Sequence, residues 1–112
     1  GKSMNDFEKK LKFQMECISE ITDKIDNKQE YMEELKKYLP YMNQVIPEIL
    51  KKSEDPQIEF ELNDEFVLQV LQDILYGIEN EDSVFLQDVL QNGLMEIYKY
   101  TLSELEDGNI YE

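Results

Sequence analysis

The sequence predicts an all-α domain: a three- or four-helix bundle in which a long N-terminal helix, bent or broken near Pro40, packs against a C-terminal antiparallel helical hairpin. Two patterns predict this fold. Over residues 7–49, apolar residues recur alternately four and three positions apart, which is typical of a helix that buries one stripe. Residues 64–106 hold two apolar helical segments joined by a short polar turn, and so short a turn places its two helices side by side.

The first helix is expected within residues 4–53. Residues 1–3 resemble an expression-vector remnant, so Met4 is the expected natural start and residues 4–112 the helical domain. Eleven of the thirteen positions in the heptad seam are apolar. The thirteen are Phe7, Leu11, Gln14, Ile18, Ile21, Ile25, Lys28, Met32, Leu35, Leu39, Met42, Ile46 and Ile49.

Two prolines interrupt this seam. Each removes a backbone amide hydrogen and strains the preceding turn, which predicts a helix break at Pro40 and a kink or a second break at Pro47. Because the seam keeps its phase through both prolines, a bent but roughly collinear path is favoured over a sharp reversal.

The seam changes in width along the helix. From residue 31 onward a flanking position is also apolar, at Tyr31, Tyr38 and Val45, which predicts contact with more than one helix. The earlier part, residues 7–25, is a narrower seam that one partner helix could cover, and we take it as a candidate homodimer interface. The candidate interface residues are Phe7, Leu11, Phe13, Ile18, Ile21 and Ile25.

Residues 54–63 are expected to form an extended linker, because acidic residues and Pro56 interrupt the helical pattern. Within the linker Ile58, Phe60 and Leu62 alternate with acidic residues, which is the two-residue period of a strand. Two interpretations follow: an extended connection that packs these three side chains onto the helices, or a strand that pairs with another chain.

The hairpin of residues 64–106 has a defined start and turn. Asn63 is the expected N-cap of its first helix, which is apolar on nearly all sides and is therefore expected to be mostly buried. The turn spans residues 80–82, and Asp82 or Ser83 is expected to cap the second helix. Gly77 is expected to lie opposite Phe85, a small residue making room for a large one. Residues 107–112 form a tail that ends the last helix, with Glu112 frayed.

Charge is divided unevenly between the two halves. Residues 1–53 carry ten lysines and ten acidic residues, a net charge of zero, whereas residues 54–112 carry sixteen acidic residues and Lys99 alone, a net charge of −15. The chain has no arginine, so nucleic acid and anionic membranes are not expected partners. A basic protein surface is the expected partner of the acidic half, and the candidate partner face is Glu79, Glu81, Asp82 and Asp88.

No catalytic, cofactor or metal site is predicted. The chain has no histidine and only one cysteine, Cys17, which excludes the usual zinc and di-iron ligand sets. The acidic clusters lack the ligand spacing of an EF-hand loop. Without a histidine base, and next to the seam residue Ile18, the Cys17 thiol is expected to be buried or half-buried rather than nucleophilic.

The run IENEDSVFLQDVL from Ile78 to Leu90, followed by Gly93, Leu94 and Glu96, resembles the ends of certain small, acidic, all-helical bacterial proteins of unknown function. The resemblance covers roughly the last third of the chain. It implies a helical fold in a Gram-positive-type cytoplasm and carries over no activity or site residue. In size and helix layout the chain is also similar to small secretion and flagellar export chaperones.

These observations lead to three functional hypotheses. The first is a non-enzymatic interaction protein, an adaptor or chaperone-like bundle in the cytoplasm, with a homodimer formed through the seam of residues 7–25. The second is an acidic inhibitor or nucleic-acid mimic that occupies a basic protein surface. The third and least favoured is a carboxylate-based hydrolase, which would need two opposed, desolvated acids in a pocket.

Overall fold

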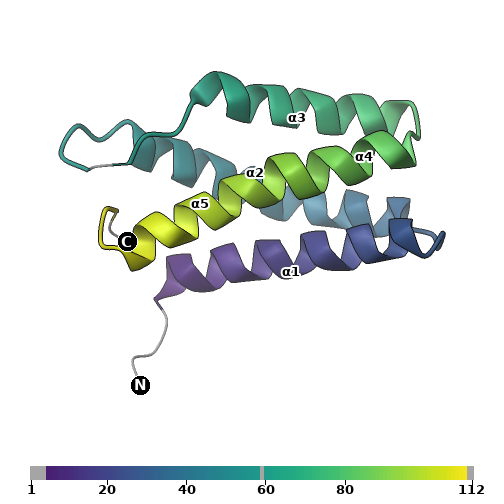
Figure 1. The fold of residues 1–112 in the computed structure, drawn as a ribbon, viewed down its shortest axis with the longest axis horizontal. Helices are drawn as coiled ribbons and strands as arrows, with labels where there is room; N and C mark the ends of the chain where they lie inside the picture. The colour runs from purple at the N-terminus through teal and green to yellow at the C-terminus, as the bar shows by residue number, and fades with distance from the viewer. Residues whose placement is uncertain (1–4, 59, 111–112) are drawn as a thin grey trace.

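The computed structural model describes residues 5–58 and 60–110. Their helical elements are α1 (Asp6–Asp26), α2 (Met32–Ser53), α3 (Asp64–Glu79), α4 (Ser83–Val89), the π-helical segment η1 (Leu90–Leu94) and α5 (Met95–Glu106). Because α4, η1 and α5 follow one another without a break, the described residues form a four-helix bundle without strands. Successive helices run in opposite directions, and α1 begins at the end of the bundle where α5 ends (Figure 1).

The prediction of an all-α bundle with a C-terminal antiparallel hairpin is confirmed. The expected vector remnant, residues 1–3, and the expected frayed end, Glu112, both lie outside the described residues.

The chain reverses between α1 and α2, and the predicted position of the break near Pro40 is wrong. Asn27 caps the end of α1, and Lys28 then takes a left-handed backbone conformation with a φ of 57°. The heptad seam therefore extends over two antiparallel helices, with its residues on α1 facing its residues on α2. Lys28 is also one of the two polar residues in the seam, and it marks the reversal.

The helix α2 continues through both prolines, so neither the predicted break at Pro40 nor a second break at Pro47 occurs, and the favoured collinear path past the prolines is confirmed. A proline in a helix leaves the carbonyl four residues earlier without its usual amide partner. Here those carbonyls belong to Lys36 and Asn43, and both residues are exposed, as are Pro40 and Pro47. Water can therefore solvate the freed carbonyls, which explains how one helix tolerates two prolines on its outer side.

The core lies between all four helices, because α1, α2, α3 and the continuous helix from α4 to α5 all contribute buried side chains. The predicted wider stripe on α2 is confirmed, because Tyr38 and Val45 are both buried. Ion pairs across the surface link the first two helices, with Lys10 Nζ 3.4 Å from Glu48 Oε2 and Lys24 Nζ 2.6 Å from Glu34 Oε1. These pairs join the start of one helix to the end of the other, as an antiparallel arrangement requires.

The linker and the tail both return apolar side chains to the core. Phe60 is buried and stacks on Tyr100 with ring centroids 5.4 Å apart, and Ile58 and Leu62 are partly buried. The three side chains thus pack onto the helices, as the interpretation of an extended connection expects. In the tail, Gly108 has a φ of +78° and Ile110 is buried.

The hairpin forms as its capping residues predict. Asn63 Oδ1 accepts hydrogen bonds from two amides at the start of α3, at 2.9 and 3.2 Å. Asp82 Oδ1 accepts one from the Phe85 amide at 3.0 Å and so begins α4. Gly77 does face large side chains, but the closer one is Leu86: a Cβ on Gly77 would lie 2.6 Å from Leu86 and 3.4 Å from Phe85.

The last helix changes to π-helical geometry between Leu90 and Leu94, where the Met95 amide donates to the Leu90 carbonyl. In a regular α-helix, a residue four positions along the chain points about 40° away from the first, so three such steps turn the direction of the side chain by about 120° around the helix axis. A π-helical turn holds one extra residue, worth about 100° of rotation, so it keeps both halves of the helix facing the core. The buried residues that recur every four positions are Leu86, Leu90, Leu94 and Tyr98, and Val89, Gly93, Ile97 and Thr101.

Candidate functional site

The helix α3 carries two parallel apolar stripes. The first consists of Val67, Val70, Ile74 and Gly77 and is buried. It packs against the last helix, where Gly77 faces Leu86 and Val70 faces Gly93. The second stripe has the same spacing of three, four and three residues, shifted by one position. We call it the outer stripe, and it consists of Leu68, Leu71, Leu75 and Ile78.

The outer stripe is open to solvent. Leu68 is 53% and Leu75 59% exposed, whereas Leu71 and Ile78 are partly buried at its inner edge. The expectation that α3 is mostly buried is therefore wrong on this side. Further apolar exposure lies around the hairpin, where Tyr76 is 57% exposed and makes an edge-to-face contact with Phe85, with ring centroids 5.6 Å apart.

Acidic residues flank the outer stripe at both ends. Asp64 and Glu65 begin α3 and Glu79 ends it, and all three are exposed. No basic residue occurs in the sequence between Lys52 and Lys99. The segment between these two lysines, which holds the stripe, therefore carries negative charge and no positive charge of its own.

All four residues of the predicted acidic partner face are exposed, but some also have local structural roles. Asp82 caps α4, and Asp88 Oδ1 accepts a hydrogen bond from Asn92 Nδ2 at 2.7 Å. Glu81 occupies the turn with a φ of 49°. Glu79, Glu81 and Asp82 thus cluster at the hairpin turn, whereas Asp88 lies farther along the last helix.

Most of the predicted homodimer interface is occupied within the chain itself. Of the six residues, Phe7, Leu11, Ile18 and Ile21 are buried and Ile25 is partly buried against the core. This is a correction to the prediction, since the chain's own helices cover the seam that a second copy was expected to cover. Phe13 alone among the six is classed as exposed, at 40%, and its ring contacts Tyr41.

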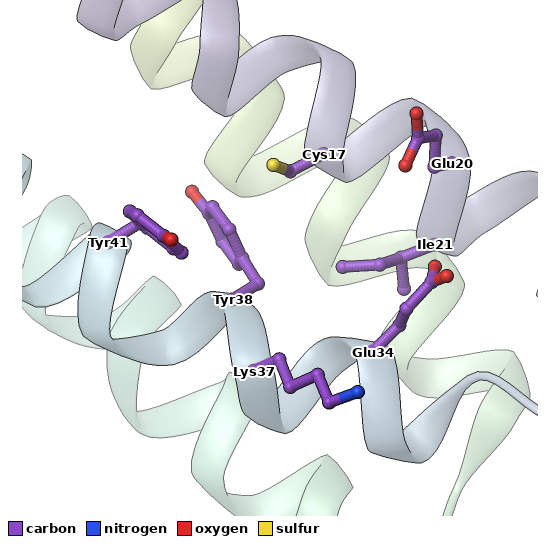
Figure 2. Close-up of a pocket in the computed structure, with 7 residues that line it drawn as sticks. All are labelled: Cys17, Glu20, Ile21, Glu34, Lys37, Tyr38 and Tyr41. Atoms are coloured by element: carbon purple, nitrogen blue, oxygen red, sulfur yellow. The ribbon is translucent and has the colours of Figure 1, made fainter.

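A small cavity of about 170 Å³ lies between α1 and α2 (Figure 2). In the close-up Cys17 and Glu20 extend from α1, opposite Tyr38 and Glu34 on α2. Burial, followed by the carboxylates of Glu20, Glu16 and Glu34, raises the pKa of the Cys17 thiol. The thiol is half-buried, as expected, and stays protonated near neutral pH.

The carboxylates in this cavity do not form the pair that a hydrolase needs. Glu20 is exposed, and Glu34 is held by its ion pair with Lys24. Two opposed, desolvated acids are therefore not found here. The cavity is also smaller than the roughly 300 Å³ at which sites for small-molecule ligands usually begin.

A buried pair of tyrosines lies behind the cavity. The hydroxyl oxygens of Tyr38 and Tyr98 are 2.6 Å apart, and both side chains are almost completely buried. Burial, together with the neighbouring Tyr98, raises the pKa of Tyr38. Burial also raises the pKa of Tyr98, although its hydrogen bond with Tyr38 lowers it in part. Both hydroxyls are therefore held neutral by the fold.

This pair predicts a loss of stability in alkali. A tyrosine whose pKa is raised by folding stabilises the protein fully below its unfolded pKa of about 10, and that stability is lost as the pH rises further. With both tyrosines the free energy of unfolding should fall by up to about 2.7 kcal/mol per pH unit above that value. Urea unfolding at pH 8, 10 and 11 measures this slope. A slope unchanged in Tyr38→Phe/Tyr98→Phe would contradict the assignment.

Known proteins do not extend this description. No protein family, curated protein or solved structure matches the chain. The resemblance of the run from Ile78 to Leu90 to small acidic bacterial proteins therefore stays a prediction.

Among the described residues, no three cysteine, aspartate or glutamate side chains group to hold a metal ion. No helix among them is long and apolar enough to cross a membrane.

The outer stripe is the feature that sequence reasoning missed. A helix with two adjacent apolar stripes gives the same sequence pattern as a helix that is buried on nearly all sides. The spacing of Leu68, Leu71, Leu75 and Ile78 could have revealed a second stripe, but not that it would be open. Its exposure depends on how many helices surround α3, which is a property of the whole bundle.

Proposed function

We propose that this protein is a non-enzymatic, helical protein-binding module of the adaptor or chaperone-like kind, acting in the cytoplasm through the outer stripe of α3. The observation that carries the proposal is the exposure of Leu68 and Leu75 on a helix whose neighbouring stripe is buried against the last helix. Exposed apolar surface of this kind, bounded by polar residues, marks interaction sites in soluble proteins.

The spacing of the stripe supports a specific contact. Scattered exposed hydrophobic residues are normal on a protein surface and need no explanation. Here four apolar residues lie in register along α3, over the eleven positions from Leu68 to Ile78. That is the pattern with which one helix receives another.

The acidic inhibitor or nucleic-acid mimic remains a second candidate. It is favoured by the net charge of −15 that residues 54–112 carry, and it would depend on charge more than on the outer stripe. The two candidates differ in their response to salt, because contacts between exposed charges weaken as ionic strength rises and apolar contacts do not.

The proposal predicts that Leu68→Asp/Leu75→Asp will lose its partners. Both side chains are more than half exposed, so the fold should persist while binding weakens at least about a hundredfold, about tenfold for each leucine. Affinity capture from the native cytoplasm, followed by titration of each retained protein, measures this. The matched control is Val84→Asp, which adds charge at a residue that is 80% exposed but off the stripe.

If the double variant retains every partner as tightly as the parent chain, the outer stripe is not the binding surface. Circular dichroism of each variant separates lost binding from lost folding.

A homodimer remains a separate proposal, for which sedimentation of Phe13→Asp beside the parent chain is the direct measurement. Since Phe13 is the exposed member of the predicted interface, its replacement should shift a dimer through this surface to monomer.

A further inference from the structure

We propose that the occupant of the outer stripe is a basic amphipathic helix of another protein, which lies along α3 as an additional helix. This inference rests on the proposed function and names the chemistry of the partner. It is carried by three features of α3: the spacing of the stripe, the satisfied backbone beneath it and the uncompensated acidic residues around it.

The geometry of the stripe favours a helical partner. The helix α3 has 16 residues and is about 24 Å long at 1.5 Å per residue. Its backbone amides and carbonyls are bonded within the helix, so no free edge is available for an extended peptide to pair with. Recognition must therefore use side chains, and the spacing of three and four residues matches the apolar face of a second helix.

The charge of the helical hairpin, which contains the stripe, favours a basic partner. Residues 64–88 carry seven carboxylates, and the sequence has no basic residue in this range. The seven are Asp64, Glu65, Asp73, Glu79, Glu81, Asp82 and Asp88. Among the described residues none of the seven takes part in an ion pair with a lysine. A cationic helix can thus approach without disrupting existing pairs, and attraction speeds its association.

The same charges argue against the other occupants of an apolar face. A second copy of this chain would bring the acidic residues at both ends of its own stripe, such as Asp64, Glu65 and Glu79, against those of the first, and like charges in an interface oppose association. An anionic membrane surface would be repelled in the same way. A helix that carries both leucine and lysine complements this surface, because its leucines can cover the stripe and its lysines can pair with the acidic residues.

Designed peptides test the inference directly. The probe is a helical peptide of about 21 residues, long enough to span α3, with leucine at the heptad core positions and lysine on its flanks. Three comparison peptides share its length: a scrambled peptide of identical composition, a peptide with glutamine for lysine, and one with glutamate for lysine. Fluorescence anisotropy measures each dissociation constant against the folded full chain.

We expect the amphipathic lysine peptide to bind at least about tenfold more tightly than each of the other three. Its affinity should fall at least about tenfold for Leu68→Ser/Leu75→Ser and should be unchanged for Val84→Ser. It should also fall at least several-fold between about 0.05 and 0.5 M salt, because the flanking charges are exposed.

Removing the charges alone provides a second, independent test. We make a triple variant, Asp64→Asn/Glu65→Gln/Glu79→Gln. It should bind the lysine peptide less tightly, and that binding should depend less on salt, while its affinity for the glutamine peptide should not change. The matched control removes three exposed charges from α1, as Glu16→Gln/Glu20→Gln/Asp23→Asn, and should have little effect.

The failures of the two proposals are distinguishable. If the glutamine peptide binds as tightly as the lysine peptide, the inference that the partner is basic is wrong, but the proposed protein-binding function is not contradicted. If the scrambled peptide binds as tightly as the lysine peptide, charge alone accounts for the attraction, and the inference that an amphipathic helix lies along α3 is wrong. If no peptide binds, the inference fails, whereas the capture experiment with Leu68→Asp/Leu75→Asp still decides the proposed function.

Discussion

Replacing Tyr98 by phenylalanine should lower the free energy of unfolding by about 1–3 kcal/mol, although the change removes a single oxygen atom. The hydroxyl of Tyr98 lies 2.6 Å from that of Tyr38, and both side chains are almost completely buried. After the substitution, the Tyr38 hydroxyl stays in the core without this partner. The penalty arises from the group left unpaired, more than from the hydrogen bond itself. Chemical denaturation of the purified variant measures it.

The double variant Tyr38→Phe/Tyr98→Phe provides the control for this explanation. It removes both hydroxyls, so no polar group is left unpaired, and its loss of stability should be smaller than the sum for the two single variants. Strict additivity would mean that the two hydroxyls do not depend on each other, and the pair would then not be a coupled unit.

Gly77→Ala should destabilise the protein by about 1–3 kcal/mol, against the usual preference of helices for alanine. A Cβ at this position would lie 2.6 Å from both Cγ and Cδ2 of Leu86, whose side chain is buried. The overlap involves the branch point of Leu86, so a rotation of its outer end cannot relieve it. We expect α3 and α4 to move apart locally, which thermal or urea unfolding would register as a lower midpoint.

Gly93→Ala is the comparison for Gly77→Ala. There a new Cβ would meet Val70 Cγ2 at 3.1 Å, which a shift of a few tenths of an ångström relieves. The gain in helix propensity can offset much of this contact, so its effect should be clearly smaller. A loss at Gly93 as large as that at Gly77 would contradict the explanation by close packing.

The hairpin could be predicted from sequence because its determinants are local. The N-cap residues Asn63 and Asp82 and the short turn between the helices act within a few residues of themselves, and the structure places them as expected. The reversal between α1 and α2 could not be predicted in the same way. The helical pattern fits both a continuous helix and two facing helices, and by residue type Pro40 is a far stronger helix breaker than Lys28, where the chain turns.

The candidate site was predicted only in part, for a different reason. The acidic character of the hairpin follows from composition, and its exposure was expected. Whether Leu68 and Leu75 are covered depends on the number and placement of the neighbouring helices, which no local pattern records. The seam of α1 shows the opposite case, because its pattern predicts that a second copy covers Leu11 and Ile18, whereas helices of the same chain cover them.

The π-helical segment from Leu90 to Leu94 makes the length of the last helix as important as its composition. A chain one residue shorter in this segment could remain helical and amphipathic, yet everything beyond it would be rotated by about 100° relative to the core. Tyr98 would then turn away from Tyr38, and Thr101 from the position where it is now buried. Single-residue deletions here would therefore be far less tolerated than substitutions at exposed positions such as Gln91 or Asn92. In this stretch the packing therefore constrains the number of residues as well as their identity.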